Sequence, residues 1–256
     1  MTSRSGVRTT AASSARRDRG VAVASLVALI GLAWLYLWLD AARMQAMPMD
    51  GAMSATFGQL MLTFLMWSVM MVGMMLPSAM PAILLYASMA GGNRGFTPSA
   101  VWLFTAGYLA VWIGFSLAAS VLQVGLAGAA LLTPMMASAS AWLSGGLLIA
   151  AGVYQWAPLK EVCLEKCRAP LQFFLFNWRP GPAGALRMGV KHGAFCVGCC
   201  WVLMLILFAV GVMNLLWVAL IAGFVLAEKL LPGGRLVGRT AGIVLAAAGV
   251  YLIAAS

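Results

Sequence analysis

The longest apolar block of the chain runs from Gly193 to Leu231 and contains only one pair of charged residues, Glu228 and Lys229. A single helix of that length would measure about 58 Å at 1.5 Å per residue, nearly twice the thickness of a bilayer's hydrocarbon core. The block must therefore fold back on itself, and its natural turn is "GVMN", Gly211–Asn214. It predicts two helices, over 193–210 and 215–230.

The composition extends this interpretation to the whole chain. Of the 256 residues 63% are hydrophobic and 9% charged, against about 45–50% and about 25% in a soluble domain. We therefore expect an all-α membrane protein, with a disordered basic cytoplasmic arm over 1–20 and a single polytopic helical domain over 21–256. The other apolar runs predict further transmembrane helices near 21–39, 57–79, 98–121, 138–157 and 237–254, which makes seven in all.

The distribution of positive charge predicts the orientation. Fifteen of the 16 Lys and Arg residues fall in segments 1–20, 80–97, 158–192 and 229–239, and only Arg43 lies elsewhere. Cytoplasmic loops carry the excess of Lys and Arg, so we expect a cytoplasmic N-terminus and an external C-terminus. The net charge of +10 then needs no nucleic-acid partner. The expected location is the bacterial inner membrane, with the lipid bilayer as partner and room for a membrane or periplasmic protein subunit.

Two short sequences concentrate the thiol and imidazole groups. "KHGAFCVGCCW", Lys191–Trp201, holds the only histidine and three of the five cysteines, and "LKEVCLEKC" holds the other two. Residues four apart share a helix face, so each sequence directs ligands to one side if it is helical. The predicted orientation places both at the cytoplasmic side, where thiols stay reduced. The candidate metal ligands are Cys163, Cys167, His192, Cys196, Cys199 and Cys200.

The spacing leaves the chemistry of these residues open. Two thiolates from each sequence would suit Zn(II), whereas fewer and softer ligands would suit Cu(I). Cysteines also pack as small apolar groups, and the adjacent Cys199 and Cys200 offer a strained redox pair. A catalytic Cys–His pair is not favoured, because the chain has no second histidine, and we do not expect an enzyme.

The 18 methionines offer a second kind of soft ligand. Thioethers bind Cu(I) without losing a proton, and the external loop "RMQAMPMDGAM" places several of them where packing gains little. A row of methionines four apart follows in the second predicted helix, although methionine also fills irregular gaps in apolar cores. The additional candidates are Met44, Met47, Met49, Met70 and Met74.

Charged residues and prolines carry three further expectations. No Asp or Glu lies in the middle of a predicted helix, which argues against a proton-driven transporter. Glu228 and Lys229 are expected to pair with each other at the cytoplasmic edge. Pro77 and Pro81 are expected to break or kink the end of the second helix and to open backbone carbonyls toward a neighbour.

Four motifs together resemble a bacterial family known only as predicted metal-binding integral membrane proteins. They are "MWSVMMVGMMLPSAMP" (66–81), "YQWAPLKEVCLEKCRAP" (154–170), "HGAFCVGCCWVLM" (192–204) and "GVMNLLWVALIAGFVLAEK" (211–229). The resemblance implies that the six Cys and His positions bind metal. The leading hypothesis is a cytoplasmic-face metal site that handles copper or zinc or assists assembly of a membrane metalloenzyme. The alternatives are a membrane thiol oxidoreductase and a structural subunit of a larger complex.

Overall fold

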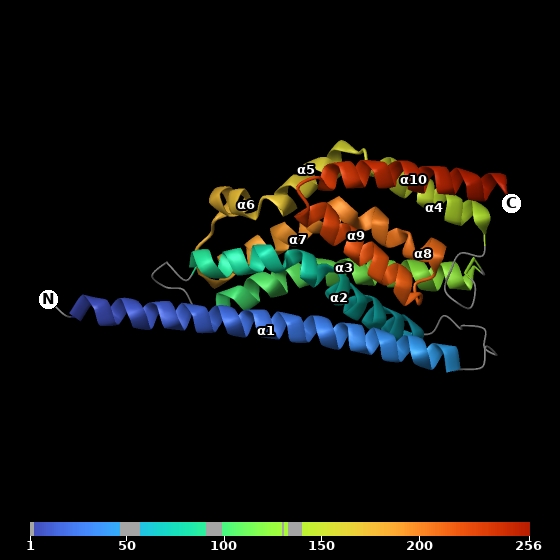
Figure 1. The fold of residues 1–256 in the computed structure, drawn as a ribbon. Coiled ribbons are helices and arrows are strands. Elements are labelled where there is room, and N and C mark those ends of the chain that lie inside the picture. Colours follow the sequence, from blue (N-terminus) through green and yellow to red (C-terminus); the bar gives the residue numbers. More distant parts are fainter. Residues whose placement is uncertain (1–2, 47–56, 91–98, 130, 133–139) are drawn as a thin grey trace.

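A computed structural model of the protein describes residues 3–46, 57–90, 99–129, 131–132 and 140–256. Helices make up nearly all of these residues, which confirms the predicted all-α fold class. They are α1 (Ser3–Ala46), α2 (Phe57–Ala90), α3 (Ser99–Gly128), α4 (Ala141–Tyr154), α5 (Pro158–Arg168), α6 (Pro170–Asn177), α7 (Gly181–Leu205), α8 (Leu207–Val210), α9 (Leu215–Leu230) and α10 (Gly234–Ala254). The N-terminal end of α1 and the C-terminal end of α10 lie at opposite ends of the bundle (Figure 1).

Five of the described segments are long and apolar enough to cross a membrane, judged by length and composition. They are Arg19–Arg43, Phe57–Ala90, Ser99–Gly128, Gly181–Val210 and Gly234–Ala254. The other two predicted helices correspond to α4 and α9, which have only 14 and 16 residues. Helices of those lengths reach about 21 and about 24 Å, less than a hydrocarbon core of about 30 Å. The structure therefore has five segments of spanning length where the sequence predicted seven.

The apolar block over 193–231 folds back where the sequence predicted. The chain leaves α8 through Gly211, whose φ of 99° lies in the left-handed region that glycine adopts most readily. Asn214 then caps α9 by accepting a hydrogen bond from the backbone N–H of Leu216 at 3.2 Å, as Asn often does at a helix start. The predicted turn at 211–214 is confirmed.

Two helices begin earlier than their apolar runs indicated. α1 starts at Ser3, so the backbone over 3–20, expected as a disordered arm, is helical. That segment has no proline and several Ala and Arg residues, and extending an existing helix is easier than nucleating one. α7 starts at Gly181 rather than Gly193, with Pro182 in its first turn, where the missing N–H of proline has no intrahelical acceptor to lose.

The second helix continues past its two prolines. α2 ends at Ala90, whereas the sequence predicted an end near 79. A proline inside a helix removes one hydrogen bond to the residue four positions earlier, so Pro77 leaves the carbonyl of Gly73 without its helical donor. The indole Nε1 of Trp34 in α1 donates to that carbonyl at 3.3 Å. The predicted opening of a carbonyl toward a neighbouring helix is confirmed, and it joins α1 to α2.

Helices α2 and α7 form the centre of the bundle, with about half of their apolar segments buried (50% and 56%), against 22% in α1 and 17% in α10. α7 packs most closely on α3, because glycines let the two backbones touch. A Cβ added at Gly107 would collide with the carbonyl of Leu186, and one at Gly189 with the carbonyl of Phe104. This approach, which only glycine permits, brings Tyr108 of α3 against α7.

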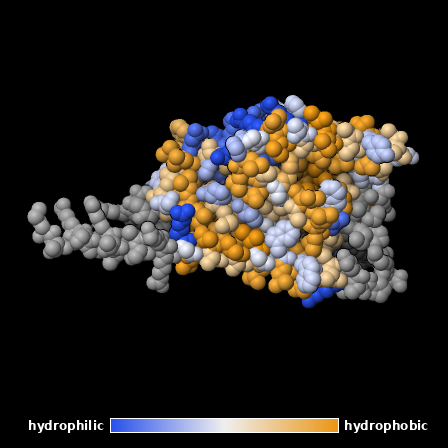
Figure 2. All heavy atoms as spheres, in the orientation of Figure 1, coloured by the Kyte–Doolittle hydropathy of each residue, from blue (hydrophilic) through white to orange (hydrophobic). Residues whose placement is uncertain are grey.

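Hydrophobic residues cover most of the face seen in Figure 2, and hydrophilic residues gather over α5 and the adjoining part of α10. Ion pairs join these two helices: Arg235 lies 3.5 Å from Glu161, and Arg239 lies 3.7 Å from the same carboxylate. The side chains are about half exposed (49% and 43%), so such pairs contribute little to stability. They mark α5 as a polar surface helix against the apolar bundle.

Candidate metal centre

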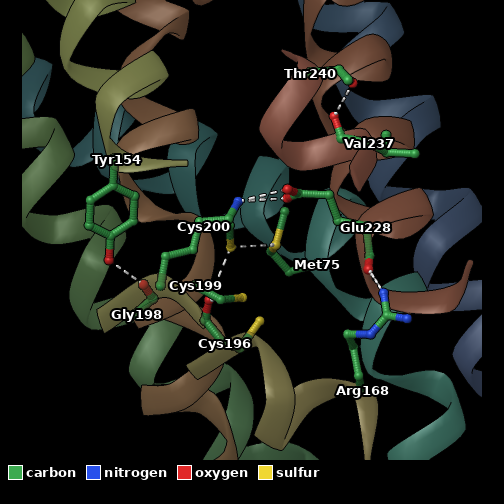
Figure 3. A network of polar contacts seen from close by, with 11 residues as sticks. Met75, Tyr154, Arg168, Cys196, Gly198, Cys199, Cys200, Glu228, Val237 and Thr240 are labelled. Atoms are coloured by element: carbon green, nitrogen blue, oxygen red, sulfur yellow. Dashed lines mark hydrogen bonds and ion pairs between the residues drawn. The ribbon is translucent and has the colours of Figure 1, made fainter. Parts of the chain in front are cut away.

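Three thiols of α7 lie together inside the bundle (Figure 3). The ligand atoms of Cys196, Cys199 and Cys200 lie within 4.8 Å of one another, and no member of the group is more than 2% exposed. Residues three and four apart adjoin on a helix, so a single turn brings the three sulfur atoms together. The thiols of Cys199 and Cys200 also donate to the backbone carbonyl of Cys196, at 3.1 and 3.0 Å.

Polar groups from neighbouring helices contact the first of these thiols. The hydroxyl of Tyr108 in α3 lies 3.0 Å from Sγ of Cys196. The ammonium of Lys229 in α9 lies 2.9 Å from the same sulfur and 3.0 Å from the hydroxyl of Ser78 in α2. Tyr108 and Lys229 are both buried. Cys196 is thus held between a hydroxyl and a positive charge in an otherwise apolar interior.

Lys229 was missed as a site residue, because the sequence suggested a pair with Glu228. The structure corrects this expectation: both carboxylate oxygens of Glu228 lie 2.8 Å from Nζ of Lys160 in α5. Successive residues of a helix do not face each other, so the two charges of α9 serve different neighbours. The sequence did contain a signal for Lys229. A lysine at the end of an apolar helix can become buried, and a buried charge requires a partner.

A methionine of α2 adds a thioether to the thiols. Sδ of Met75 lies 4.0 Å from Sγ of Cys200 (Figure 3). The predicted candidates Met70 and Met74 are buried in the apolar core of the same helix. The side chain of Met44 and the whole of Met47 and Met49 lie outside the described part of the chain.

Helix α5 packs along α7 and brings the other two cysteines to this region. Sγ of Cys163 lies against Gly198, 2.6 Å from the position that a Cβ would take there. Cys167 is half-buried, and its thiol forms hydrogen bonds with those of Cys196 and Cys199. These bonds raise the pKa of the Cys167 thiol well above its ordinary value, and burial raises the pKa of Cys163; hydrogen bonds from a protonated donor favour the neutral form. The two cysteine sequences therefore meet at Cys163 and Cys167, where α5 packs on α7.

The histidine lies beside the three thiols rather than among them. His192 is 3% exposed, and its ring centroid is 6.0 Å from those of Phe104 and Tyr108 and 5.1 Å from that of Phe173. Its Nδ1 has no hydrogen-bond partner among the described residues. The sequence correctly indicated that His192 and Cys196 share one helix face. The aromatic rings of α3 and α6, however, surround the imidazole of His192.

The donors that converge here are soft. Three thiols and one thioether offer only sulfur. Thiolates bind both Cu(I) and Zn(II), but zinc takes thiolate, imidazole and carboxylate ligands, so the thioether favours Cu(I). Three thiolates around one Cu(I) carry excess negative charge, which is costly to bury without a nearby cation. Lys229 places a cation 2.9 Å from Cys196. The arrangement therefore fits Cu(I).

Comparison with known protein families shows which family the chain is similar to. Residues 64–252 match the family PpoB2, described as copper chaperone; no curated protein and no solved structure matches the chain. The matched region contains all five cysteines, Met75 and Lys229. The description supports the metal-binding character implied by the sequence motifs and names copper, with no support for zinc. Because the match covers most of its length, the chain belongs to the copper chaperone family PpoB2.

Proposed function

We propose that the protein is an integral membrane copper chaperone, which binds one Cu(I) through the thiolates of Cys196, Cys199 and Cys200 and passes it to a protein partner during assembly of a metalloenzyme. The buried group of three thiols within 4.8 Å carries the proposal, in a chain of a copper chaperone family. Soft sulfur donors bind Cu(I) in preference to harder ions, which suits a protein that must hold this metal selectively.

The surroundings suit storage of a reduced metal ion. The cluster is almost fully buried, and an apolar shell controls solvent access to a metal. The hydroxyl of Tyr108 at 3.0 Å and the ammonium of Lys229 at 2.9 Å fix the position of Cys196. Met75 extends the sulfur surface at Cys200. Copper at this position would be held by sulfur and shielded from water, and Lys229 would offset part of the negative charge of the thiolates.

The proposal places the protein in the bacterial inner membrane with its N-terminus in the cytoplasm. Support comes from the five apolar segments of spanning length and from the positions of the two chain ends at opposite ends of the bundle (Figure 1). Opposite ends require an odd number of crossings, and α4 and α9 as short crossings would give seven. Alkaline carbonate washing of membranes should leave the protein in the pellet, and its release into the wash would contradict this placement.

The two alternative functions gain no support. The matched family is described by copper and not by thiol oxidation, and the thiols of Cys199 and Cys200 donate to a backbone carbonyl. A purely structural role does not explain why three thiols, a thioether and an ammonium converge at one place.

Copper analysis of the full-length protein in detergent tests the proposal. The protein is purified anaerobically, incubated with Cu(I) and freed of unbound metal. We expect about one copper per chain, because three sulfur donors form one soft site, and loss of that copper in Cys196→Ser/Cys199→Ser. Cys163→Ser is the matched control, since that sulfur lies against Gly198 and its loss should leave the copper content unchanged. Copper well below one per chain, or retained in the double variant, contradicts the proposal.

A further inference from the structure

The three thiols of the proposed copper site have almost no contact with the surface. Cys196, Cys199 and Cys200 are 1%, 2% and 0% exposed, so a chelator or a receiving protein cannot reach copper there directly. Cys163 is also buried, and among the five cysteines Cys167 alone is partly exposed. Its side chain also packs against the core cluster to which the three buried thiols belong.

We propose that Cys167 is the exchange ligand through which Cu(I) enters and leaves the buried thiols. The inference rests on the proposed function, because it describes how copper reaches that same site. Cys167 has the two properties that an exchange ligand needs: a side chain packed against the core cluster that contains the three thiols, and partial exposure at the edge of the protein.

The neighbouring residue fixes Cys167 in place. The guanidinium of Arg168 donates to the backbone carbonyls of Glu228, Leu231 and Pro232, the last two at 2.7 and 3.1 Å (Figure 3 shows the first). These bonds hold the C-terminal end of α5 to the end of α9, which also carries Lys229. These bonds therefore fix the position of Cys167 relative to Lys229, and α5 keeps Cys167 beside the three buried thiols.

Cys199 is the thiolate that Cys167 replaces. Cys196 is held by a hydroxyl and an ammonium, and Cys200 faces the thioether of Met75. The thiol of Cys199 donates to a carbonyl of its own helix, and α5, which carries Cys167, packs along that helix.

The exchange step is a substitution at copper with no change of oxidation state. The Cys167 thiol gives up its proton and forms a Cu–S bond, while the Cu–S bond to Cys199 breaks and that thiolate takes up a proton. A thiol of the receiving protein, or an added chelator, then displaces Cys167 in the same manner. Copper stays Cu(I) throughout, so the step needs neither oxidant nor reductant.

The test compares copper release with copper content. Full-length protein loaded with Cu(I) is mixed anaerobically with bathocuproine disulfonate, and formation of the coloured Cu(I) complex is followed over time. We expect Cys167→Ser to slow release by about tenfold or more, while its copper content stays at the wild-type level. Cys163→Ser, which changes the other thiol of α5, should release copper at the wild-type rate. Cys167→Met keeps a soft donor and should restore most of the rate.

Three results would overturn the inference. Unchanged release from Cys167→Ser would show that copper leaves by another route, and loss of copper from this variant at equilibrium would make Cys167 a resident ligand. Cys167→Ala provides the same comparison if the serine variant does not fold. In the wild type, a release rate independent of chelator concentration even at low concentration would indicate opening of the bundle instead of exchange. Absence of bound copper in the wild type is a separate outcome, because it refutes the proposed function itself.

Discussion

The ammonium nitrogen of Lys229 lies 2.9 Å from the sulfur of Cys196, although the two residues are 33 positions apart in the chain. Lys229 is 6% exposed, and it also lies 3.0 Å from the hydroxyl of Ser78. A buried charge is expensive unless it is paired, so this ammonium requires an anionic neighbour. A thiolate at Cys196, free or bound to copper, provides one.

Removal of this charge should weaken copper binding. We expect Lys229→Met, which keeps the length of the side chain, to lower the affinity for Cu(I) by about tenfold or more, equivalent to about 1.4 kcal/mol. Lys191→Met is the matched control, because Lys191 is an exposed cation bonded to Asn177. Competition with a chromogenic Cu(I) chelator measures both. Equal affinities for Lys229→Met and wild type would show that the charge plays no part in binding.

The thioether of Met75 should contribute to the site, whereas that of its neighbour Met74 should not. Met75→Leu removes a sulfur 4.0 Å from Cys200, and loss of a residue that supports the ligands typically costs about tenfold in metal affinity. Met74→Leu makes the same change in the core of the same helix. Both swaps nearly conserve volume and should cost less than about 1.5 kcal/mol of folding stability. A larger loss of affinity for Met74→Leu than for Met75→Leu would reverse the assignment.

The reactivity of Cys167 in the copper-free protein should show a raised pKa. Hydrogen bonds with Cys196 and Cys199 favour its protonated form, and only the thiolate reacts with alkylating reagents. The rate of its alkylation by iodoacetamide should therefore stay low at neutral pH and rise with an inflection above about 8.5, the ordinary value for cysteine. In Cys196→Ser/Cys199→Ser the inflection should move down toward that value. Mass spectrometry of the labelled peptide follows the reaction, and a wild-type inflection at or below the ordinary value is the opposing result.

The buried pair between Lys160 and Glu228 should matter for stability far more than the exposed pairs of α5. The side chains of the buried pair are 3% and 2% exposed, and breaking such a pair costs about 3–5 kcal/mol because one charge stays buried alone. Glu228→Gln should therefore lower the thermal unfolding temperature clearly. Glu161→Gln, which breaks half-exposed pairs with Arg235 and Arg239, should change stability by about 0–1 kcal/mol. Similar unfolding temperatures for both variants would contradict this difference.

Local patterns in the sequence predicted what depends on periodicity and turn chemistry. The apolar block over 193–231 was too long for one helix, and Gly211 and Asn214 supplied the turn. The spacing of Cys196 and Cys200 indicated a shared helix face, and the structure brings their sulfur atoms together.

Contacts between helices could not be predicted, because they depend on how each helix is rotated in the bundle. Met74 and Met75 belong to similar rows four residues apart, and only the rotation of α2 in the bundle brings Met75 to Cys200. Lys229 and Glu228 are adjacent in sequence, yet α9 directs one to Cys196 and the other to Lys160. The length of α2 also depended on tertiary contacts, since Trp34 satisfies the carbonyl that Pro77 frees.

X-ray absorption at the copper edge identifies the atoms that surround the bound metal. The full-length protein, loaded anaerobically with one Cu(I) per chain, should show a copper ion surrounded by sulfur alone, with about three sulfur neighbours from Cys196, Cys199 and Cys200. The edge should be that of Cu(I), and Cys200→Ser should lower the sulfur count. A first shell of nitrogen or oxygen atoms, or a sulfur shell unchanged by substitutions at these three cysteines, would contradict the account.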